Sequence, residues 1–140
     1  MVVVDGEGIP LGGQITSAST AEVKLAQPTL DTIGVPDAQG RPQRPVRLIL
    51  DRGYDSDPLR EELLAADILM ICPHRRNRKA PQFNDGRHLR RYRKRWKVER
   101  TIAWLGNYRR LTVRYDRRLE SYRAFFQIAC ALITLRRLTK

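Results

Sequence analysis

The first half of the chain alternates short apolar runs with turn residues, a pattern typical of strands joined by tight connections. Val2–Val4 is a β-branched run that meets the turn sequence Asp5-Gly6-Glu7-Gly8, so residues 9–16 are expected to return as the second arm of a hairpin. Two later runs, residues 46–50 and 68–72, have the length and apolar character of buried strands. The pattern therefore predicts a hairpin followed by two further strands.

Helices are expected between and after these strands. The first two are predicted over residues 19–33 and 57–66, each after Ser, Thr or Asp residues that favour a helix N-terminus. In the second half, residues 86–106 and 119–138 show longer helical patterns of apolar positions, with a basic, irregular stretch over residues 107–118 between them.

The order of these elements predicts an α/β fold with one mixed sheet flanked by helices. At 140 residues the chain has room for a single domain. We divide it into a hairpin over residues 1–17, an alternating helix and strand core over residues 18–73, and a basic loop with helices over residues 74–140. The apolar face of the last helix is expected to pack beneath the sheet.

The net charge of +12 is distributed unevenly along the chain. Residues 1–73 carry 6 basic and 11 acidic residues, whereas residues 74–118 carry 17 basic and 3 acidic residues. Such a basic region attracts polyanions, of which nucleic acid is the leading candidate. Trp96 and Trp104 within it are expected in the core, and Tyr108 and Tyr115 could equally stack on bases.

Composition excludes several other classes of protein. Cys72 and Cys130 lie far apart and outside any CxxC or Cys/His cluster, which argues against a zinc site or a disulfide framework. The longest mostly apolar stretch has 12 residues, whereas a membrane-spanning helix needs ~20. Neither a signal peptide nor a phosphate-binding glycine motif is present in the sequence, so we expect a cytoplasmic protein without a nucleotide cofactor.

Asp51 is the first candidate for chemistry because it directly follows the apolar run of residues 46–50. Open α/β sheets place their sites at the carboxyl ends of strands. The structural alternative is an aspartate that accepts a hydrogen bond from the backbone of its own turn.

Glu99 is the second candidate because it falls within the apolar arc of the helix predicted over residues 86–106. A carboxylate on the sheet-facing side of a helix loses hydration unless a cation meets it. Arg95, one turn earlier, could form a structural ion pair with Glu99. The functional alternative is that Glu99 lies beside Asp51 and the two bind Mg²⁺, which prefers hard oxygen ligands.

Several segments resemble bacterial insertion-sequence transposases of the DDE type, and they occur in the order found in that family. The resemblance covers nearly the whole chain. The similar segments are Val4-Asp-Gly-Glu-Gly-Ile-Pro-Leu, Leu48-Ile-Leu-Asp-Arg-Gly-Tyr-Asp-Ser-Asp-Pro-Leu-Arg, Pro73-His-Arg-Arg-Asn-Arg-Lys, Tyr92-Arg-Lys-Arg-Trp-Lys-Val-Glu-Arg-Thr-Ile-Ala-Trp-Leu, Tyr108-Arg-Arg-Leu and Arg114-Tyr-Asp-Arg.

The resemblance implies an RNase H-like fold and the cutting and joining of DNA at the ends of a mobile element, with Mg²⁺ or Mn²⁺. It makes Asp51 the second and Glu99 the third acid of the catalytic triad, and these two would be the metal ligands. Gly106 stands where the family signature often has a lysine. The residues expected to bind DNA are Arg75, Arg76, Arg78, Lys79, Tyr92, Arg95, Lys97, Arg100, Arg109, Arg110 and Arg114.

The first acid of the family lies on a strand that precedes the opening hairpin, and Asp5 has the context of a hairpin turn instead. The expectation is therefore an RNase H-like domain that is incomplete at its N-terminus, from a truncated, frameshifted or two-frame transposase. The chain would act with an N-terminal part, as a homodimer on terminal inverted repeats and target DNA, and would lack strand transfer alone. The alternative is an inactive fragment that only binds DNA.

Overall fold

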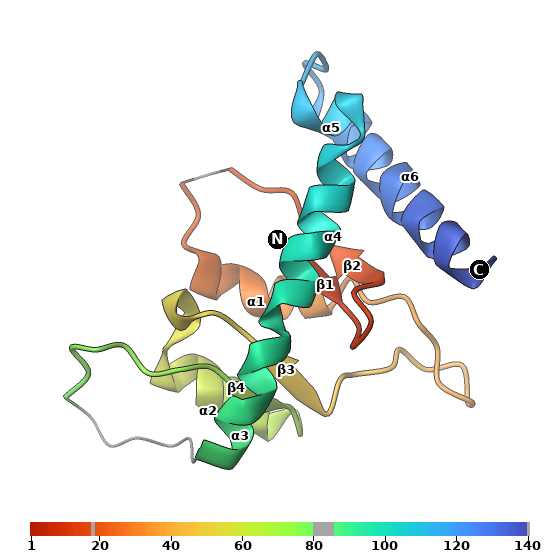
Figure 1. Cartoon of the computed structure of the whole chain (residues 1–140). Helices are drawn as coiled ribbons and strands as arrows, with labels where there is room; N and C mark the ends of the chain where they lie inside the picture. The colour runs from red at the N-terminus through yellow and green to blue at the C-terminus, as the bar shows by residue number, and fades with distance from the viewer. Residues whose placement is uncertain (18, 80–85, 140) are drawn as a thin grey trace.

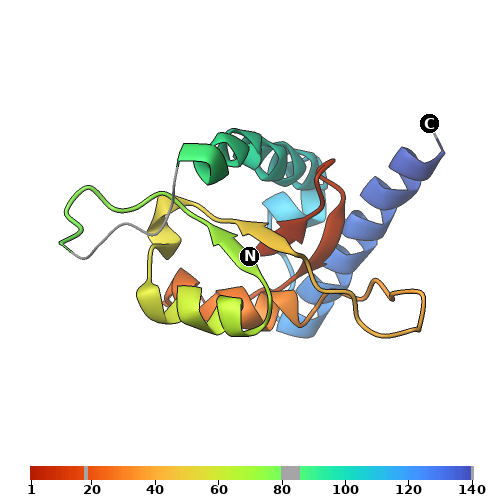
Figure 2. The same ribbon diagram turned by 90° about the horizontal axis from the view of Figure 1, so that it is seen from below.

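The computed structural model describes residues 1–17, 19–79 and 86–139. Within them the elements labelled in Figure 1 form three layers, with small sheets in the middle and helices on both sides, as the turned view in Figure 2 shows. Seen from below, α1 and α2 cover one side of the strands, and α3 and α4 cover the other (Figure 2). These helices span Ala26–Leu30 (α1), Asp57–Ala65 (α2), Gly86–Tyr92 (α3) and Trp96–Gly106 (α4).

The predicted hairpin is confirmed. Strands β1 (Val2–Val4) and β2 (Pro10–Gly13) pair antiparallel with an irregularity near Val4. The Asp5 carboxylate accepts hydrogen bonds at 2.8 Å from the backbone N–H groups of Glu7 and Ile9, so Asp5 stabilises the turn, as expected.

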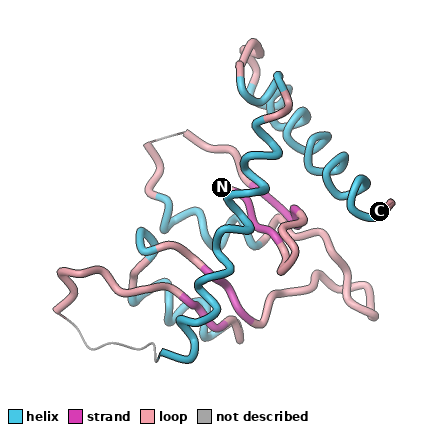
Figure 3. The backbone as a smooth tube through the Cα atoms, in the orientation of Figure 1, coloured by secondary structure: helices cyan, strands magenta, loops and turns pink. Residues whose placement is uncertain are grey.

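The two later strands are also confirmed, as β3 (Arg47–Ile49) and β4 (Leu69–Ile71). They pair in parallel, and α2 connects them along the chain. However, the expected single mixed sheet is not what the described residues form. They contain one antiparallel and one parallel two-stranded sheet that share no hydrogen bonds, and Figure 3 shows the two pairs as separate magenta segments. The mixed α/β class is therefore confirmed, and the continuous sheet is not.

The helix predicted over residues 19–33 is shorter than expected. A 3₁₀ turn, η1 (Glu22–Leu25), leads into α1, and no side chain caps either one. The expected anchors still form the core, because Ala26 and Leu30 are buried against Leu48 of β3.

The helix predicted over residues 86–106 is present as α3 and α4, joined by the 3₁₀ turn η3 (Arg93–Arg95). The stretch predicted to be irregular contains a short helix, α5 (Arg109–Thr112). The last helix, α6 (Leu119–Leu138), has the predicted bounds. None of the described helices has both the length and the apolar character that crossing a bilayer requires.

The expectation that α6 packs beneath the sheet is wrong. Helices α1, α2 and α4 already cover the two sides of the strands, and α6 instead packs against α4, α5 and β2. Ala129 and Ile133 of α6 form a second small core with Leu105 of α4. Phe126 lies so close to Gly13 that a Cβ on this glycine would be 2.6 Å from the ring, which fixes α6 against the hairpin.

Candidate active site

Asp51 is held by its backbone and its side chain at the carboxyl end of β3. The Cys72 thiol, buried beside β4, donates to the Asp51 carbonyl at 2.9 Å. Burial raises the pKa of Cys72 to about 11, so the thiol keeps its proton and remains a donor. The Asp51 carboxylate accepts a hydrogen bond at 2.7 Å from the Gly53 N–H, which begins the 3₁₀ turn η2 (Arg52–Tyr54). The structural alternative for Asp51, a turn aspartate, is therefore observed.

Replacing Gly53 by Ala is expected to displace the Asp51 carboxylate. A Cβ at position 53 would lie 2.9 Å from Asp51 Oδ1, closer than real Cβ contacts come. Losing the 2.7 Å hydrogen bond should lower the free energy of unfolding by about 1 kcal/mol, measured by urea denaturation. Gly106→Ala is the matched control, because a Cβ there meets nothing within 4 Å; equal losses in the two variants would contradict the expectation.

Glu99 lies on α4 and is more exposed than the sequence pattern predicts. Its side chain is 55% exposed, and Arg95 Nη2 contacts its Oε1 at 2.6 Å. The ion pair expected as the structural alternative is therefore present. The prediction of a buried, sheet-facing position is wrong, because the side of α4 that carries Glu99 and Ile102 lines an open cavity instead of a packed sheet.

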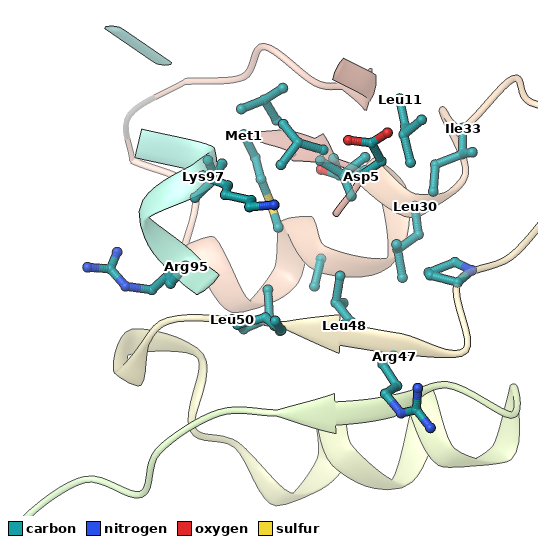
Figure 4. A pocket seen from close by; sticks show the side chains of 18 of the residues that line it. Met1, Asp5, Leu11, Leu30, Ile33, Arg47, Leu48, Leu50, Arg95 and Lys97 are labelled. Atoms are coloured by element: carbon teal, nitrogen blue, oxygen red, sulfur yellow. The ribbon is translucent and has the colours of Figure 1, made fainter. Parts of the chain in front are cut away.

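This cavity has a volume of about 850 Å³, and both Asp51 and Glu99 line it. It lies between the hairpin and β3, as the close view shows, with Leu30 and Leu48 on its walls and the Met1 side chain reaching into it (Figure 4). The structure thus brings the two candidate acids to one cavity. Among the described residues, no three His, Cys, Asp or Glu side chains form a group that could hold a metal ion.

Besides Asp51, Glu99 and the turn residue Asp5, the cavity wall carries Glu22, an acid that the sequence pattern did not single out. Burial, together with the negative charges of Glu22 and Asp51, raises the pKa of the Tyr54 hydroxyl to about 12. Glu22 was missed because it lies in a 3₁₀ turn outside any recognised motif. Glu22 and Asp51 thus place two carboxylates with Tyr54 on the wall of the same cavity.

Helix α4 is fixed to the hairpin turn by three side chains. Lys97 donates to the Gly6 carbonyl and pairs with the Glu7 carboxylate at 3.0 Å. Arg100 donates to the Glu7 carbonyl at 2.6 Å, and the buried Thr101 hydroxyl donates to the Gly8 carbonyl at 2.5 Å. Lys97 and Arg100, both expected to bind DNA, therefore hold α4 over the cavity.

The basic loop is attached to the core through Asp55, whose side chain is 2% exposed. Its carboxylate contacts Arg60 at 2.7 Å and His74 Nδ1 at 3.0 Å, and accepts a hydrogen bond from the Arg75 N–H at 2.7 Å. Burial alone would raise the pKa of Asp55, but these hydrogen bonds together lower it to about 2.

Arg78 also contacts this group of side chains. We call Asp55, Arg60, His74 and Arg78 the Asp55 cluster. The guanidinium of Arg78 pairs with Asp57 at 2.8 Å and lies 3.6 Å from Asp55, and the Arg78 side chain is 10% exposed. Arg75 also reaches inward, donating to the Gly53 carbonyl at 2.7 Å. Two cations expected to bind DNA thus anchor the loop beside η2. Residues 80–85 of that loop lie outside the described residues.

The remaining predicted DNA-binding residues lie nearer the surface. Arg76, Lys79 and Arg109 are exposed. Other cations lie over aromatic rings, with guanidinium carbons 5.3–5.8 Å from the ring centres: Arg95 over Tyr92, Arg110 over Phe125 and Arg114 over Tyr122. Three further cations that were not among the predicted DNA-binding residues are also exposed: Arg90, Arg93 and Lys94 of α3 and η3.

The two tryptophans differ in burial. Trp104 packs against the second core, as expected, whereas Trp96 is 51% exposed and the expectation for it is wrong. The guanidinium of Arg100 lies 4.8 Å from the Trp96 ring and 4.7 Å from the Trp104 ring.

Comparison with known proteins identifies the family. A family model described as "Transposase DDE domain" matches residues 1–134. A Burkholderia cepacia protein named "Putative transposase for insertion sequence element IS402" is 38% identical over 141 residues. That match covers 97% of this chain and 63% of the relative, so the chain spans less than two thirds of the relative's length. No solved structure matches significantly. The chain therefore belongs to the DDE transposases of insertion sequences.

Proposed function

We propose that this chain is the C-terminal part of a transposase that cuts and joins DNA at the ends of an insertion sequence. The supporting observation is that Asp51, at the end of β3, and Glu99, on α4, line the same cavity although they are far apart in sequence. The enzyme would act as a homodimer on terminal inverted repeats and target DNA, in the bacterial cytoplasm.

Asp51 and Glu99 are the residues that would hold Mg²⁺ or Mn²⁺. Both supply hard carboxylate oxygens, which these ions prefer, so the donor set fits in kind. When bound, the metal supplies activation of a water or a 3′-hydroxyl and stabilises the leaving oxygen. The chain fixes Asp51 through Cys72 and Gly53, and Arg95 positions the Glu99 carboxylate.

The isolated chain is expected to lack strand transfer. The family resemblance implies a further aspartate on a strand that precedes the hairpin, and Asp5 has the turn role instead. A gel assay with labelled terminal repeats and Mg²⁺ tests this expectation. Cleavage by the 140-residue chain alone would show that it carries a complete site.

Binding of the chain to duplex DNA is expected to weaken steeply as salt increases. Each cation that neutralises a phosphate contributes about 0.9 to the slope of log K against log salt. Replacing Arg90, Arg93 and Lys94 by Ala, all exposed on α3 and η3, should therefore reduce that slope by between about 2 and 3. Fluorescence anisotropy at several salt concentrations measures the slope.

The matched control for this experiment is Arg41→Ala with Arg44→Ala. These arginines lie in the loop after α1 and pair with Asp37 and Asp31 at 2.9 and 2.6 Å. Their loss should leave the slope unchanged. A slope that is the same in both variants would place the DNA-binding surface elsewhere.

The second candidate is a non-catalytic DNA-binding fragment. It is favoured by the contacts that both acids already make, Asp51 with the Gly53 N–H and Glu99 with Arg95. The coding DNA upstream of Met1 distinguishes the two. A segment encoding an aspartate on a short apolar strand, with terminal repeats flanking the element, supports the enzyme; an unrelated gene supports the fragment.

A further inference from the structure

We propose that Gly8 and Thr101 are a positioning pair that determines where Glu99 lies in the cavity. Their contact fixes the distance of α4 from the hairpin turn and the rotation of α4 about its own axis. The inference rests on the proposed function in that Glu99 is taken as a metal ligand. Neither Gly8 nor Thr101 is one of the acids that the family resemblance assigns to catalysis.

The contact lies in the buried part of the interface between α4 and the hairpin. Figure 1 shows α4 crossing the hairpin, and α4 packs against β1. Thr101 is 0% exposed, Gly8 is buried, and the Thr101 hydroxyl donates to the Gly8 carbonyl at 2.5 Å. A buried carbonyl that loses its donor gains no hydrogen bond from water in exchange. The hydrogen bonds of Lys97 and Arg100 to the same turn are exposed, so water can replace them.

The backbone of the turn packs directly on α4 because residue 8 has no side chain. Gly8 has a φ of +78°, a conformation that other residues rarely adopt. A Cβ at position 8 would lie 3.2 Å from Thr101 Oγ1, 3.2 Å from the Lys97 carbonyl oxygen and 3.0 Å from Arg100 Nη2. The Lys97 carbonyl belongs to the helix backbone and cannot move without the helix. A larger residue at position 8 would therefore push the turn away from α4.

Helix geometry connects this contact to Glu99. Successive residues of an α-helix are about 100° apart around its axis, so Thr101 and Glu99 point in nearly opposite directions. Val98 and Ile102 lie between them on the same arc, and both line the cavity together with Glu99. Thr101 therefore anchors one edge of the arc to the hairpin, and Glu99 lies at the other edge.

The position of Glu99 is sensitive to this anchor because it lies at the edge of the arc. The next positions around the helix, Ala103 and Trp96, are exposed. A rotation of α4 that turned these two residues toward the strands would move Glu99 relative to Asp51. Groups that orient metal ligands contribute about 10- to 100-fold to metal affinity, so a lost anchor should be measurable as weaker metal binding.

The first test removes the Thr101 hydroxyl from the full 140-residue chain. Thr101→Val keeps the size of the side chain, and Thr101→Ser keeps the hydroxyl. Calorimetry should show Mn²⁺ binding that is weaker by about tenfold or more in Thr101→Val and within about twofold of the parent chain in Thr101→Ser. Thr134→Val is the matched control, because that hydroxyl donates within α6 at 3.0 Å. Equal Mn²⁺ affinity in the parent chain and in folded Thr101→Val would overturn the proposal.

The second test keeps the hydroxyl and also serves where Thr101→Val does not fold. Gly8→Ala should weaken Mn²⁺ binding by about tenfold, because its Cβ pushes the turn away from α4. Gly40→Ala is the matched control for backbone strain. Gly40 has nearly the same φ, +77°, but a Cβ there meets nothing within 4 Å. Equal Mn²⁺ affinities of the two variants would mean that contact with α4 is irrelevant, which contradicts the proposal.

Residual dipolar couplings of backbone N–H groups separate this inference from the proposed function, because they report the orientation of α4 without metal. Thr101→Val should change the couplings of α4 relative to those of β1 and β2, and Thr101→Ser should not. Unchanged couplings in Thr101→Val would refute the anchor. Changed couplings in Thr101→Val, with a parent chain that binds no Mn²⁺, would support the anchor and refute the proposed metal site.

Discussion

Asp51→Asn and Glu99→Gln should each lower metal-dependent DNA cleavage by about 10³-fold or more, while DNA binding stays within about twofold. A carboxylate that holds a catalytic metal contributes several kcal/mol to transition-state stabilisation, and each 1.36 kcal/mol is a factor of ten in rate. The measurement uses a chimaera that joins this chain to the part of the Burkholderia cepacia relative outside the matched region.

Both substitutions are chosen to leave the fold unchanged. Asn at position 51 keeps an oxygen that can accept the hydrogen bond from the Gly53 N–H, now at 2.7 Å, and asparagine suits such a position as well as aspartate does. Glu99 is 55% exposed, so losing its ion pair should cost no more than about 1 kcal/mol.

Asp31→Asn is the matched control, because Asp31 is also an exposed acid in an ion pair, with Arg44 at 2.6 Å. It should cleave like the parent enzyme. Calorimetry of Mn²⁺ binding to the 140-residue chain gives a measurement that does not depend on catalysis. Asp51→Asn should weaken this Mn²⁺ binding. Normal cleavage by both Asp51 and Glu99 variants would show that these acids are not the metal ligands.

The sequence predicted the elements whose signals are local. Val2–Val4 followed by Asp5-Gly6 specifies a hairpin through turn chemistry, and the structure confirms both the strands and the role of Asp5. The bounds of α6 follow from its apolar periodicity over Leu119–Leu138. Asp51 was found for a similar reason, because it lies where an apolar run ends.

The features that depend on long-range packing were not predicted. The pattern of α4 correctly placed Glu99 among apolar residues, but whether an apolar arc meets a sheet or a cavity depends on which strands are present. Trp96 is 51% exposed although the same arc contains it, so the apolar pattern of a helix does not by itself say which of its positions are buried. Lys97 and Arg100 were predicted from the sequence to bind DNA. Periodicity alone could not show that both side chains donate hydrogen bonds to backbone carbonyls of the hairpin turn.

The Asp55 cluster illustrates a signal that sequence reasoning could have used. Asp55 and Asp57 lie in the acidic turn that follows β3, and the basic loop follows β4. Because β3 and β4 are parallel neighbours, both segments begin at the carboxyl end of the same sheet. Opposite charges at the ends of neighbouring parallel strands favour an ion pair. The basic loop was assigned to DNA as a whole, whereas Arg78 in fact contacts Asp55 and Asp57.

Asp55→Asn is expected to cause the largest loss of stability among the substitutions considered. Removing one member of a buried ion pair leaves the charge of its partner uncompensated, which costs about 3 kcal/mol. The partner here is Arg60, whose guanidinium contacts Asp55 at 2.7 Å and whose side chain is only 10% exposed. For a domain of this size, such a loss should lower Tm by about 10 °C, measured by circular dichroism. Asp57→Asn is the control, because Asp57 also pairs with Arg78 but is 35% exposed, and it should cost no more than about 1 kcal/mol.

The pH dependence separates the charge of Asp55 from its shape. Its pKa is about 2 in the folded chain and about 3.9 in an unfolded one, so the native state favours the ionised form. The stability from this ionisation is complete above about pH 4 and is lost as the pH falls toward 2. The difference in the free energy of unfolding between the parent chain and Asp55→Asn should therefore shrink over that range. A difference that stays constant from pH 7 to about pH 2 would mean that packing of the side chain, and not its charge, attaches the basic loop to the core beside Asp51.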